Sequence, residues 1–343
     1  MTTNCITIGC EYNPPKGGIA QVLYNYKKYI FPEFKCITNS GHGNAIYKLW
    51  KAVSALIQLF FTLLFNKQIK IVHIHTASYN SFRRSAWFVH LGKMMNRKVI
   101  LHIHGGGFKE FYQTAPQYIS TVLNRCDCII TLSQKWQEYF KTISTCPIIE
   151  VVDNVIAPPT ILNVKKKDNK THLLFLGLIT EQKGIFDLLE VLSEHKNELE
   201  TKIVLHIGGN GKIDKLKEVI QSHQLNDMVI FEGWVANQKK AELFNYADAF
   251  ILPSYTEGLP LSILEAFSYG LPVLTTPVGG IPEIITTSNG ILFHPGNKTE
   301  IYNSIISLLE FKTNTEQIKE QSKKYLPEQI RSKLNTIYNN LND

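Results

Sequence analysis

Cysteine is scarce in this sequence and is confined to the first half of the chain. The six cysteines are Cys5, Cys10, Cys36, Cys126, Cys128 and Cys146, and none forms a C-x-x-C pair. Such a set offers neither the dense framework of a disulfide-stabilised secreted domain nor the ligand spacing of a zinc site. We therefore expect reduced cysteines, with Cys126 and Cys128 buried as small apolar residues, in a chain that works in the cytoplasm.

Long uninterrupted apolar runs are missing as well. The run that begins at Cys5 is too short for the apolar core of a secretory signal peptide. The longest apolar stretch, Leu49–Phe65, is interrupted by Lys51, Ser54 and Gln58 and is shorter than a membrane-spanning helix. We interpret it as a helix that packs on a core, and the alternative is that the same helix also touches lipid.

Acidic residues are few in the first half, which makes the charge uneven. Residues 1–150 hold 17 Lys and Arg against 6 Asp and Glu, or +11, and the remainder holds 19 against 23, or −4. The aromatic residues are not interleaved with the basic ones and no nucleic-acid motif is present, so we expect no nucleic-acid partner. A basic half also suits an anionic membrane surface or a phosphorylated acceptor.

Runs typical of buried parallel strands alternate with helical segments along both halves of the chain, as at Cys5–Cys10 and His172–Leu176. This alternation predicts an α/β protein with two doubly wound, Rossmann-like domains. We place an N-terminal domain at 1–155, a polar linker at 156–170 and a second domain at 171–325. Residues 326–343 form a terminal helix.

The stretch from Tyr255 to Gly280 is the most informative part of the sequence. Ala249–Leu252 predicts a strand, and Leu261–Tyr269 predicts a helix that ends at Gly270. Glu257 lies in the loop between them, where open α/β sheets bind ligands, and Glu265 lies in the helix. Carboxylates accept hydroxyl donors and a helix N-terminus suits phosphate, so the pair suits a sugar nucleotide, although each acid alone could be an ordinary surface residue.

This stretch, E-G-L-P-L-S-I-L-E-A with seven residues between Glu257 and Glu265, resembles the signature of retaining nucleotide-sugar glycosyltransferases of family 4. The resemblance implies the GT-B fold, in which two Rossmann-like domains face each other across a cleft and the terminal helix returns to the N-terminal domain. It implies a nucleoside-diphosphate sugar donor, with a UDP-sugar favoured, and no cofactor or divalent metal. With the basic first half, it suggests a lipid-linked saccharide acceptor in bacterial O-antigen or capsule synthesis, at the cytoplasmic face of the membrane.

The resemblance also implies roles for residues of the second domain. Glu265 would accept the ribose hydroxyls, Glu257 the hydroxyls of the transferred sugar, and Lys183 would neutralise the departing diphosphate. Glu257 is not expected to act as a nucleophile. The backbone positions implied in binding are Gly258, Leu259, Leu261, Gly233 and Val235.

In the first domain the resemblance points to a glycine-rich loop and one histidine. Gly17 and Gly18 precede a predicted helix at Ile19–Tyr29, where backbone N–H groups can approach phosphate, although a plain turn explains the same pattern. His104 ends a strand before three glycines and would contact the transferred sugar.

Two H-x-H pairs lie on predicted strands in this half. They are His73 and His75, and His102 and His104. They lack accompanying carboxylate or cysteine ligands, so we expect no metal site, with His73 and His102 in the core.

One position departs from the family pattern. Leu178 stands where an arginine of the diphosphate clamp is expected. This departure is the best argument for one alternative to a transferase, a catalytically silent nucleotide-sugar-binding protein. A nucleotide-sugar epimerase on the same fold is the other alternative, and the spacing of Glu257 and Glu265 and the presence of Lys183 speak against it.

Overall fold

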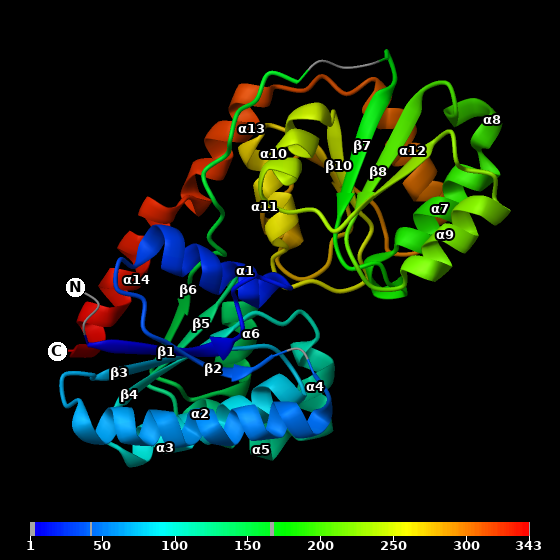
Figure 1. The fold of residues 1–343 in the computed structure, drawn as a ribbon. Coiled ribbons are helices and arrows are strands. Elements are labelled where there is room, and N and C mark those ends of the chain that lie inside the picture. The colour runs from blue at the N-terminus through cyan, green and yellow to red at the C-terminus, as the bar shows by residue number, and fades with distance from the viewer. Residues whose placement is uncertain (1–3, 42, 165–167, 343) are drawn as a thin grey trace. The chain divides into compact units, whose positions relative to one another are not determined.

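The computed structural model describes residues 4–41, 43–164 and 168–342, and the chain forms two compact units. The first unit joins residues 1–157 to 325–343, and the second is formed by 158–324. Each contains a six-stranded sheet in which all neighbouring strands are parallel, with helices on both faces (Figure 1). The predicted α/β class with two doubly wound domains is therefore confirmed. Residues 165–167 of the predicted linker lie outside the described residues.

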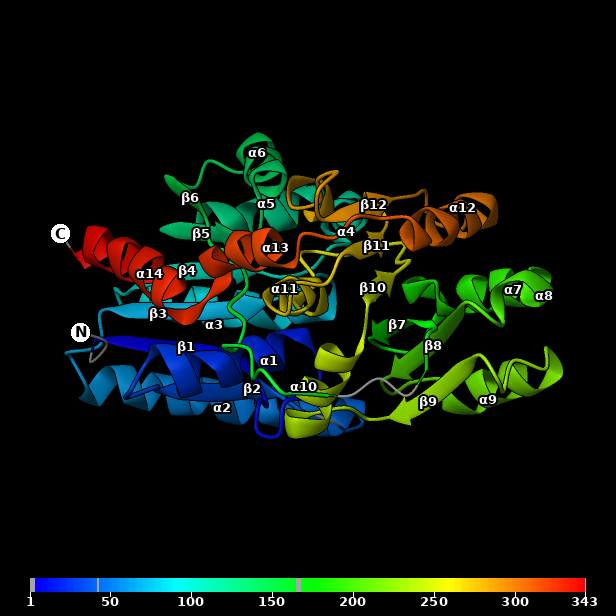
Figure 2. The same cartoon turned by 90° about the horizontal axis from the view of Figure 1, so that it is seen from above.

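The sheet of the first unit has the strand order β2-β1-β3-β4-β5-β6 (Figure 2). Its strands are β1 (Cys5–Cys10), β2 (Cys36–Ser40), β3 (Ile71–Thr76), β4 (Lys98–Ile103), β5 (Cys128–Thr131) and β6 (Ile148–Val151). Because β2 and β3 lie on opposite sides of β1, the chain changes direction between β1 and β3. The loops that follow these two strands flank the point where open α/β sheets bind ligands.

Helices cover both faces of this sheet. One face carries α2 (Ala45–Phe65), α3 (Asn80–Met94), α4 (Phe108–Thr114), α5 (Pro116–Asn124) and α6 (Gln134–Ile143), which share one apolar core. The other carries α1 (Gly18–Asn25) and α14 (Pro327–Asn342) (Figure 1). The helix expected at Ile19–Tyr29 is regular only to Asn25 and continues as a π-helical turn, Tyr26–Ile30. This turn buries Tyr26 and Ile30 in the contact with α14.

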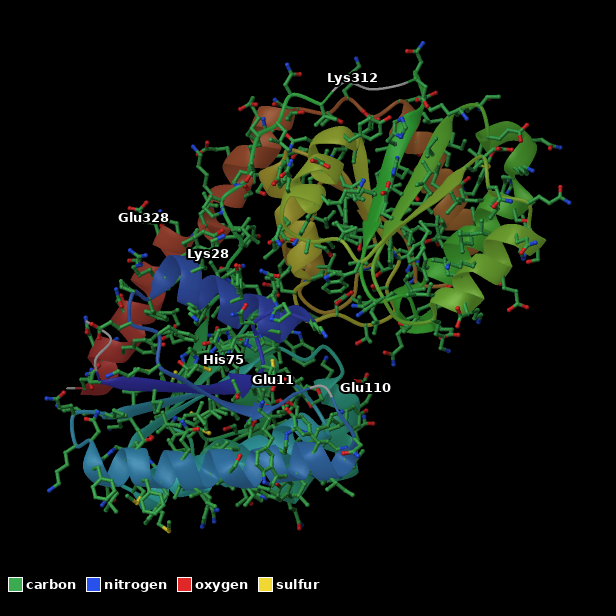
Figure 3. The ribbon with its side chains drawn as sticks, in the orientation of Figure 1. Glu11, Lys28, His75, Glu110, Lys312 and Glu328 are labelled. Carbon is green, nitrogen blue, oxygen red and sulfur yellow. The ribbon has the colours of Figure 1, made fainter. Side chains whose placement is uncertain are left out.

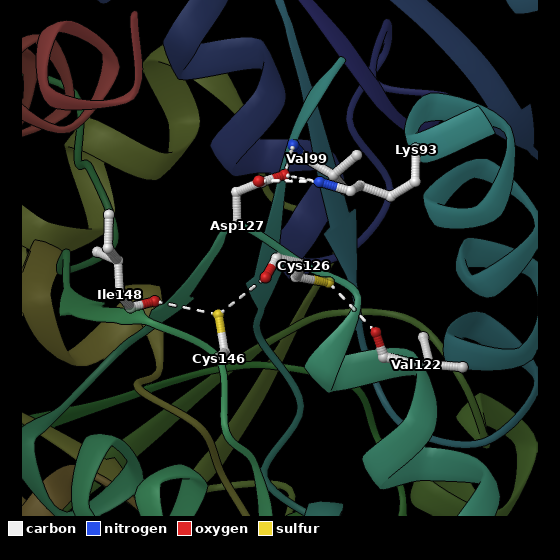
Figure 4. A network of polar contacts seen from close by, with 7 residues as sticks. All are labelled: Lys93, Val99, Val122, Cys126, Asp127, Cys146 and Ile148. Atoms are coloured by element: carbon white, nitrogen blue, oxygen red, sulfur yellow. Dashed lines mark hydrogen bonds and ion pairs between the residues drawn. The ribbon is translucent and has the colours of Figure 1, made fainter. Parts of the chain in front are cut away.

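A polar network ties β5 to its neighbours (Figure 4). The Asp127 carboxylate accepts from Lys93 Nζ at 2.7 Å and from the Val99 N–H at 2.8 Å. Beside it, the Cys146 thiol donates to the Cys126 carbonyl at 3.3 Å. Burial raises the pKa of Cys146 to about 11, which keeps it as an unreactive thiol. The cysteines of the described residues are free, as expected, and Cys126 and Cys128 are buried.

The sheet of the second unit has the order β12-β11-β10-β7-β8-β9 (Figure 2). Its strands are β7 (Thr171–Leu176), β8 (Ile203–Gly208), β9 (Val229–Gly233), β10 (Ala249–Leu252), β11 (Val273–Thr275) and β12 (Gly290–Leu292). Its helices are α7 (Ile185–Glu194), α8 (Lys196–Leu199), α9 (Ile213–Ser222), α10 (Asn237–Tyr246), α11 (Leu261–Ser268), α12 (Lys298–Leu309) and α13 (Thr315–Ser322). The direction of the chain reverses between β7 and β10, so the loops after these strands flank the switch point.

Candidate nucleotide-sugar site

The two loops at the switch point of the second unit pack directly on each other. The N–H of Tyr255, after β10, donates to the carbonyl of Gln182, after β7, at 2.9 Å. Gly184 ends the first loop with φ 65°, and a Cβ there would lie 2.0 Å from the carbonyl oxygen of Pro253. Only glycine fits this left-handed turn at such a close approach. The contact holds the residue before it, Lys183, over the second loop.

Lys183 and Glu257 meet at this point. The Lys183 ammonium donates to Glu257 Oε1 at 2.5 Å, and the Ser254 hydroxyl donates to the same oxygen at 2.7 Å. Glu257 is only 9% exposed. An ammonium has three donor hydrogens, so Lys183 can serve Glu257 and an anionic ligand together. Two residues far apart in sequence thus place a cation and a carboxylate at the carboxyl edge of the sheet.

The glycine-rich turn after β11 packs against the backbone of Glu257. Gly279 has φ 58°, and a Cβ there would lie 2.0 Å from the Glu257 carbonyl oxygen. The N–H of Gly280 donates to the carbonyl of Gly258 at 2.7 Å. The loop that carries Glu257 therefore has backbone hydrogen bonds to the loop after β7 and to the turn after β11.

Glu265 lies on α11, which begins right after this loop. It is 7% exposed, and Lys240 Nζ donates to its Oε1 at 2.5 Å. Pro260 precedes the helix without a side-chain cap, and the first N–H groups of a helix have no partner within it. Gly258, Leu259 and Leu261 thus surround a helix N-terminus with its positive dipole end.

Sequence reasoning missed Lys240. Lys240 lies on α10, which runs from Asn237 to Tyr246. Its partner Glu265 lies on α11, 25 residues further along the chain. No spacing rule connects residues of two helices separated by a strand.

The strands on the other side of β7 end at the same edge. The N–H of Gly209, after β8, donates to the carbonyl of Gly233, the last residue of β9, at 2.8 Å. Gly233 has φ 72° with open space where a side chain would lie, and Val235 follows two residues later. Because parallel strands end at one edge of a sheet, these positions lie at the same edge as Lys183. Leu178, in the loop after β7, is 48% exposed.

The glycine-rich loop of the first unit also follows a strand at a switch point, that of β1 and β3. Gly17 has φ 119°, and no atom lies within 4 Å of the Cβ positions of Gly17 or Gly18. Gly17 precedes α1 without a side-chain cap. The backbone at this helix N-terminus is therefore open to approach.

His104 lies directly after β4, and its two ring nitrogens have protein partners. Nε2 lies 2.9 Å from His75 Nδ1, and Nδ1 lies 3.2 Å from Asn154 Oδ1. Burial lowers the pKa of His104 to about 4, although the Asn154 hydrogen bond opposes this. The ring is therefore neutral near pH 7. To bond a sugar hydroxyl, it would exchange one of these partners.

The other three histidines of the H-x-H pairs are buried in the first unit (Figure 3 shows His75). The expectation that His73 and His102 belong to the core is confirmed. One potential ligand atom from each of His73, His75 and His102 lies within 4.8 Å of the others. However, both ring nitrogens of His73 have protein partners, because Nδ1 lies 2.7 Å from the Tyr338 hydroxyl and Nε2 lies 3.3 Å from His102 Nδ1. The absence of a metal site stays our prediction.

The predicted site residues thus fall into two groups. Lys183, Glu257, Gly258, Leu259, Leu261, Glu265, Gly233 and Val235 belong to the second unit, and Gly17, Gly18 and His104 to the first. Within the second unit, Lys183 and Glu257 are in direct contact, and Glu265 follows on the adjoining helix.

Comparisons with known proteins also lead to glycosyltransferases. Residues 160–325, nearly all of the second unit, match the family Glycosyl transferases group 1. An uncharacterized glycosyltransferase of Methanocaldococcus jannaschii is 25% identical over 308 residues, covering 83% of this chain and 76% of the relative. The amylovoran biosynthesis glycosyltransferase AmsK of Erwinia amylovora is 28% identical over 173 residues, covering 46% of this chain and 41% of the relative.

Among solved structures, HepE of Anabaena in complex with UDP-glucose superposes with a TM-score of 0.75 at 17% identity, covering 97% of this chain and 99% of that one. The likeness at this level of identity shows the fold, which is GT-B. The second unit is thus similar in sequence to glycosyltransferases of this family, and the whole chain shares the GT-B fold.

Proposed function

We propose that this chain is a retaining glycosyltransferase of family 4 that transfers a sugar from a nucleoside-diphosphate sugar, with a UDP-sugar favoured, to a lipid-linked glycan. The observation that carries the proposal is the Lys183–Glu257 pair, joined at 2.5 Å at the switch point. A cation there can meet a diphosphate, and the carboxylate beside it can meet sugar hydroxyls. The complex of HepE with UDP-glucose is consistent with this donor class.

In the proposed reaction, the bond between the sugar and the diphosphate breaks as the acceptor hydroxyl attacks from the same face, and the hydroxyl proton passes to the departing diphosphate. Lys183 and the N–H groups near the start of α11 stabilise the charge on the departing diphosphate. Glu265 holds the ribose, and Glu257 holds the transferred sugar without forming a bond to it. These cationic and dipolar groups take the role that a divalent metal has in other transferases.

Two observations support the proposed acceptor, one from the relatives and one from the charge of the first unit. The match to an amylovoran biosynthesis enzyme supports a place in the synthesis of a bacterial surface polysaccharide. The excess of basic residues in the first half suits the phosphate of a lipid-linked saccharide. We propose a cytoplasmic enzyme that meets this acceptor at the inner face of the membrane.

A silent nucleotide-sugar-binding protein is the second candidate, and Leu178 favours it. This side chain is 48% exposed in the loop that carries Lys183, where the family pattern has an arginine. Single-turnover release of nucleoside diphosphate from the bound donor would exclude the silent protein.

Replacing Glu265 with alanine is expected to weaken binding of the preferred nucleoside diphosphate about 10- to 150-fold. The ribose hydroxyls lose a charged acceptor, a loss of about 1.5–3 kcal/mol. Calorimetric titration with UDP, GDP, ADP and CMP, without metal, identifies the preferred nucleotide first. Glu242→Ala, at a partly exposed glutamate on α10, is the matched control. Equal affinity in Glu265→Ala and the control would remove Glu265 from the site.

Replacing His104 with alanine is expected to slow turnover far more than it weakens nucleotide binding, because the proposed contact is with the transferred sugar. Turnover and nucleotide affinity are measured on the same preparation. A loss of affinity with unchanged turnover would move His104 out of the sugar subsite.

A further inference from the structure

Helix α2 carries two apolar stripes, and only one of them is covered. Ala52, Ala55, Leu59 and Leu63 are buried against the first unit. A second stripe is exposed and recurs at helical spacing, through Ile46, Leu49, Trp50, Val53, Ile57 and Phe60. The sequence predicted a helix that packs on a core, and α2 does so with only one of its two apolar stripes. Only 22% of the most apolar window of this helix is buried, whereas a core helix is mostly buried.

The exposed stripe continues into a groove between α2, α3 and α5, which lie on the same face of the sheet (Figure 1). The groove has a volume of about 680 Å³. Ile57 and Phe61 of α2, Trp87 of α3 and Tyr118 of α5 line it, and all four are exposed. An apolar patch of this extent marks an interaction surface rather than ordinary surface scatter.

The charge of this face identifies its partner. The sequences of α2, α3 and α5 contain no aspartate or glutamate. Of their basic residues, Lys51 is paired with Glu11 and Lys93 with Asp127, which leaves Lys48 and Arg83 as the exposed ones. Just after α5, the Arg125 guanidinium lines the groove and donates to His90 Nδ1 at 2.8 Å. A surface that combines exposed aromatic and aliphatic side chains with an excess of basic residues is complementary to an anionic lipid bilayer.

The packing of α2 decides how it would meet lipid. The helix has 21 residues and is long and apolar enough to cross a membrane. However, its buried stripe belongs to the core of the first unit, and crossing would strip that core of Ala55, Leu59 and Leu63. The helix can keep these contacts only if it lies in the interface, with its exposed stripe among the headgroups and upper acyl chains.

We propose that the face formed by α2, α3 and α5, with the groove between them, docks the first unit on an anionic membrane. The exposed stripe of α2 enters the interface, and the groove accepts an acyl chain whose phosphate headgroup lies at Arg125. This inference deepens the proposed function, since its role in the reaction, bringing the enzyme to a lipid-linked acceptor, rests on that function. The docking itself does not depend on transferase activity.

The experiment is flotation of the purified full chain with vesicles of phosphatidylcholine, alone or with about 30% phosphatidylglycerol, at low salt. We expect binding to the anionic vesicles that weakens at high salt, because exposed charges are screened. The double variant Ile57→Gln and Phe61→Gln is expected to bind at least about 10-fold more weakly, since glutamine keeps the helix propensity but removes the apolar insertion. Arg125→Gln is expected to lose about five-fold on anionic vesicles only.

The matched control replaces exposed apolar side chains of the second unit, Ile161→Gln with Ile230→Gln, and should bind vesicles as the parent does. Nucleotide affinity, measured on all variants, should stay unchanged. Absence of binding to anionic vesicles, or equal binding by the α2 variant, would overturn the docking proposal while leaving the transferase intact. If the parent ignores vesicles and the α2 variant converts a dimer into a monomer in sedimentation, the face joins two copies of the chain instead. Vesicle binding by a chain that binds no nucleotide would contradict the proposed function alone.

Discussion

Replacing Lys183 with alanine is expected to slow release of the nucleoside diphosphate from the bound donor by about 10²–10³. The ammonium lies at the switch point, 2.5 Å from Glu257, where charge on the departing diphosphate would develop. A preorganised donor acts there without reorganisation cost, and the loss of one such donor costs about 2.7–4 kcal/mol of transition-state stabilisation. Single-turnover release measures this step and needs no knowledge of the natural acceptor.

A second lysine of the same unit provides the control for this prediction. Lys298 pairs with Glu190 and Glu194 on the surface of the second unit, and Lys298→Ala removes an ion pair of the same chemistry. Its release rate should match that of the parent. Lys183→Arg should recover part of the rate, because it restores the charge but not the compact geometry of the ammonium. A Lys183→Ala protein that releases the diphosphate within two-fold of the parent rate would show that the clamp lies elsewhere.

The first unit is expected to lose stability steeply as the pH falls from about 6.5 to about 4. Burial lowers the pKa of His104 to about 4 and that of His73 to about 3, and it lowers those of His75 and His102 well below their ordinary value. The unfolded chain takes up protons near pH 6.5, so within this window it binds more protons than the folded chain. Stability therefore rises with pH here and is fully present above pH 6.5. His104 alone accounts for a change on the order of 3 kcal/mol.

Hydrogen exchange read by mass spectrometry follows both units in one sample. After correction for intrinsic exchange rates, protection in β3 and β4 should fall between pH 6.5 and 4.5, and more than in β7 and β10. His102→Leu removes one titrating group and should flatten the slope, whereas His294→Gln, at an exposed histidine, should not. If His102→Leu does not fold, the pH dependence of protection in the parent protein still tests the prediction. Protection in the first unit that does not change with pH would mean that these rings are charged or hydrated in the native state.

Much of the site was predictable because its residues sit beside local signals. Glu257 and Lys183 lie in loops that a strand precedes and a helix follows, and such boundaries can be recognised from short windows of sequence. Lys240 was missed because its partner Glu265 belongs to another helix. The partners of His104 were missed for the same reason, since His75 and Asn154 lie 29 and 50 residues away.

By itself, the sequence determined the alternation of strands and helices, and with it the α/β class, the two doubly wound units and the loops that hold Glu257 and Lys183. These features depend on local periodicity and on glycine and proline at element ends, which act over a few residues. Only the tertiary structure decided the strand order, the Lys183–Glu257 contact, and the exposed stripe of α2. An apolar helix has the same sequence pattern whether one face or two are covered, and long-range packing against the sheet covers only one of them.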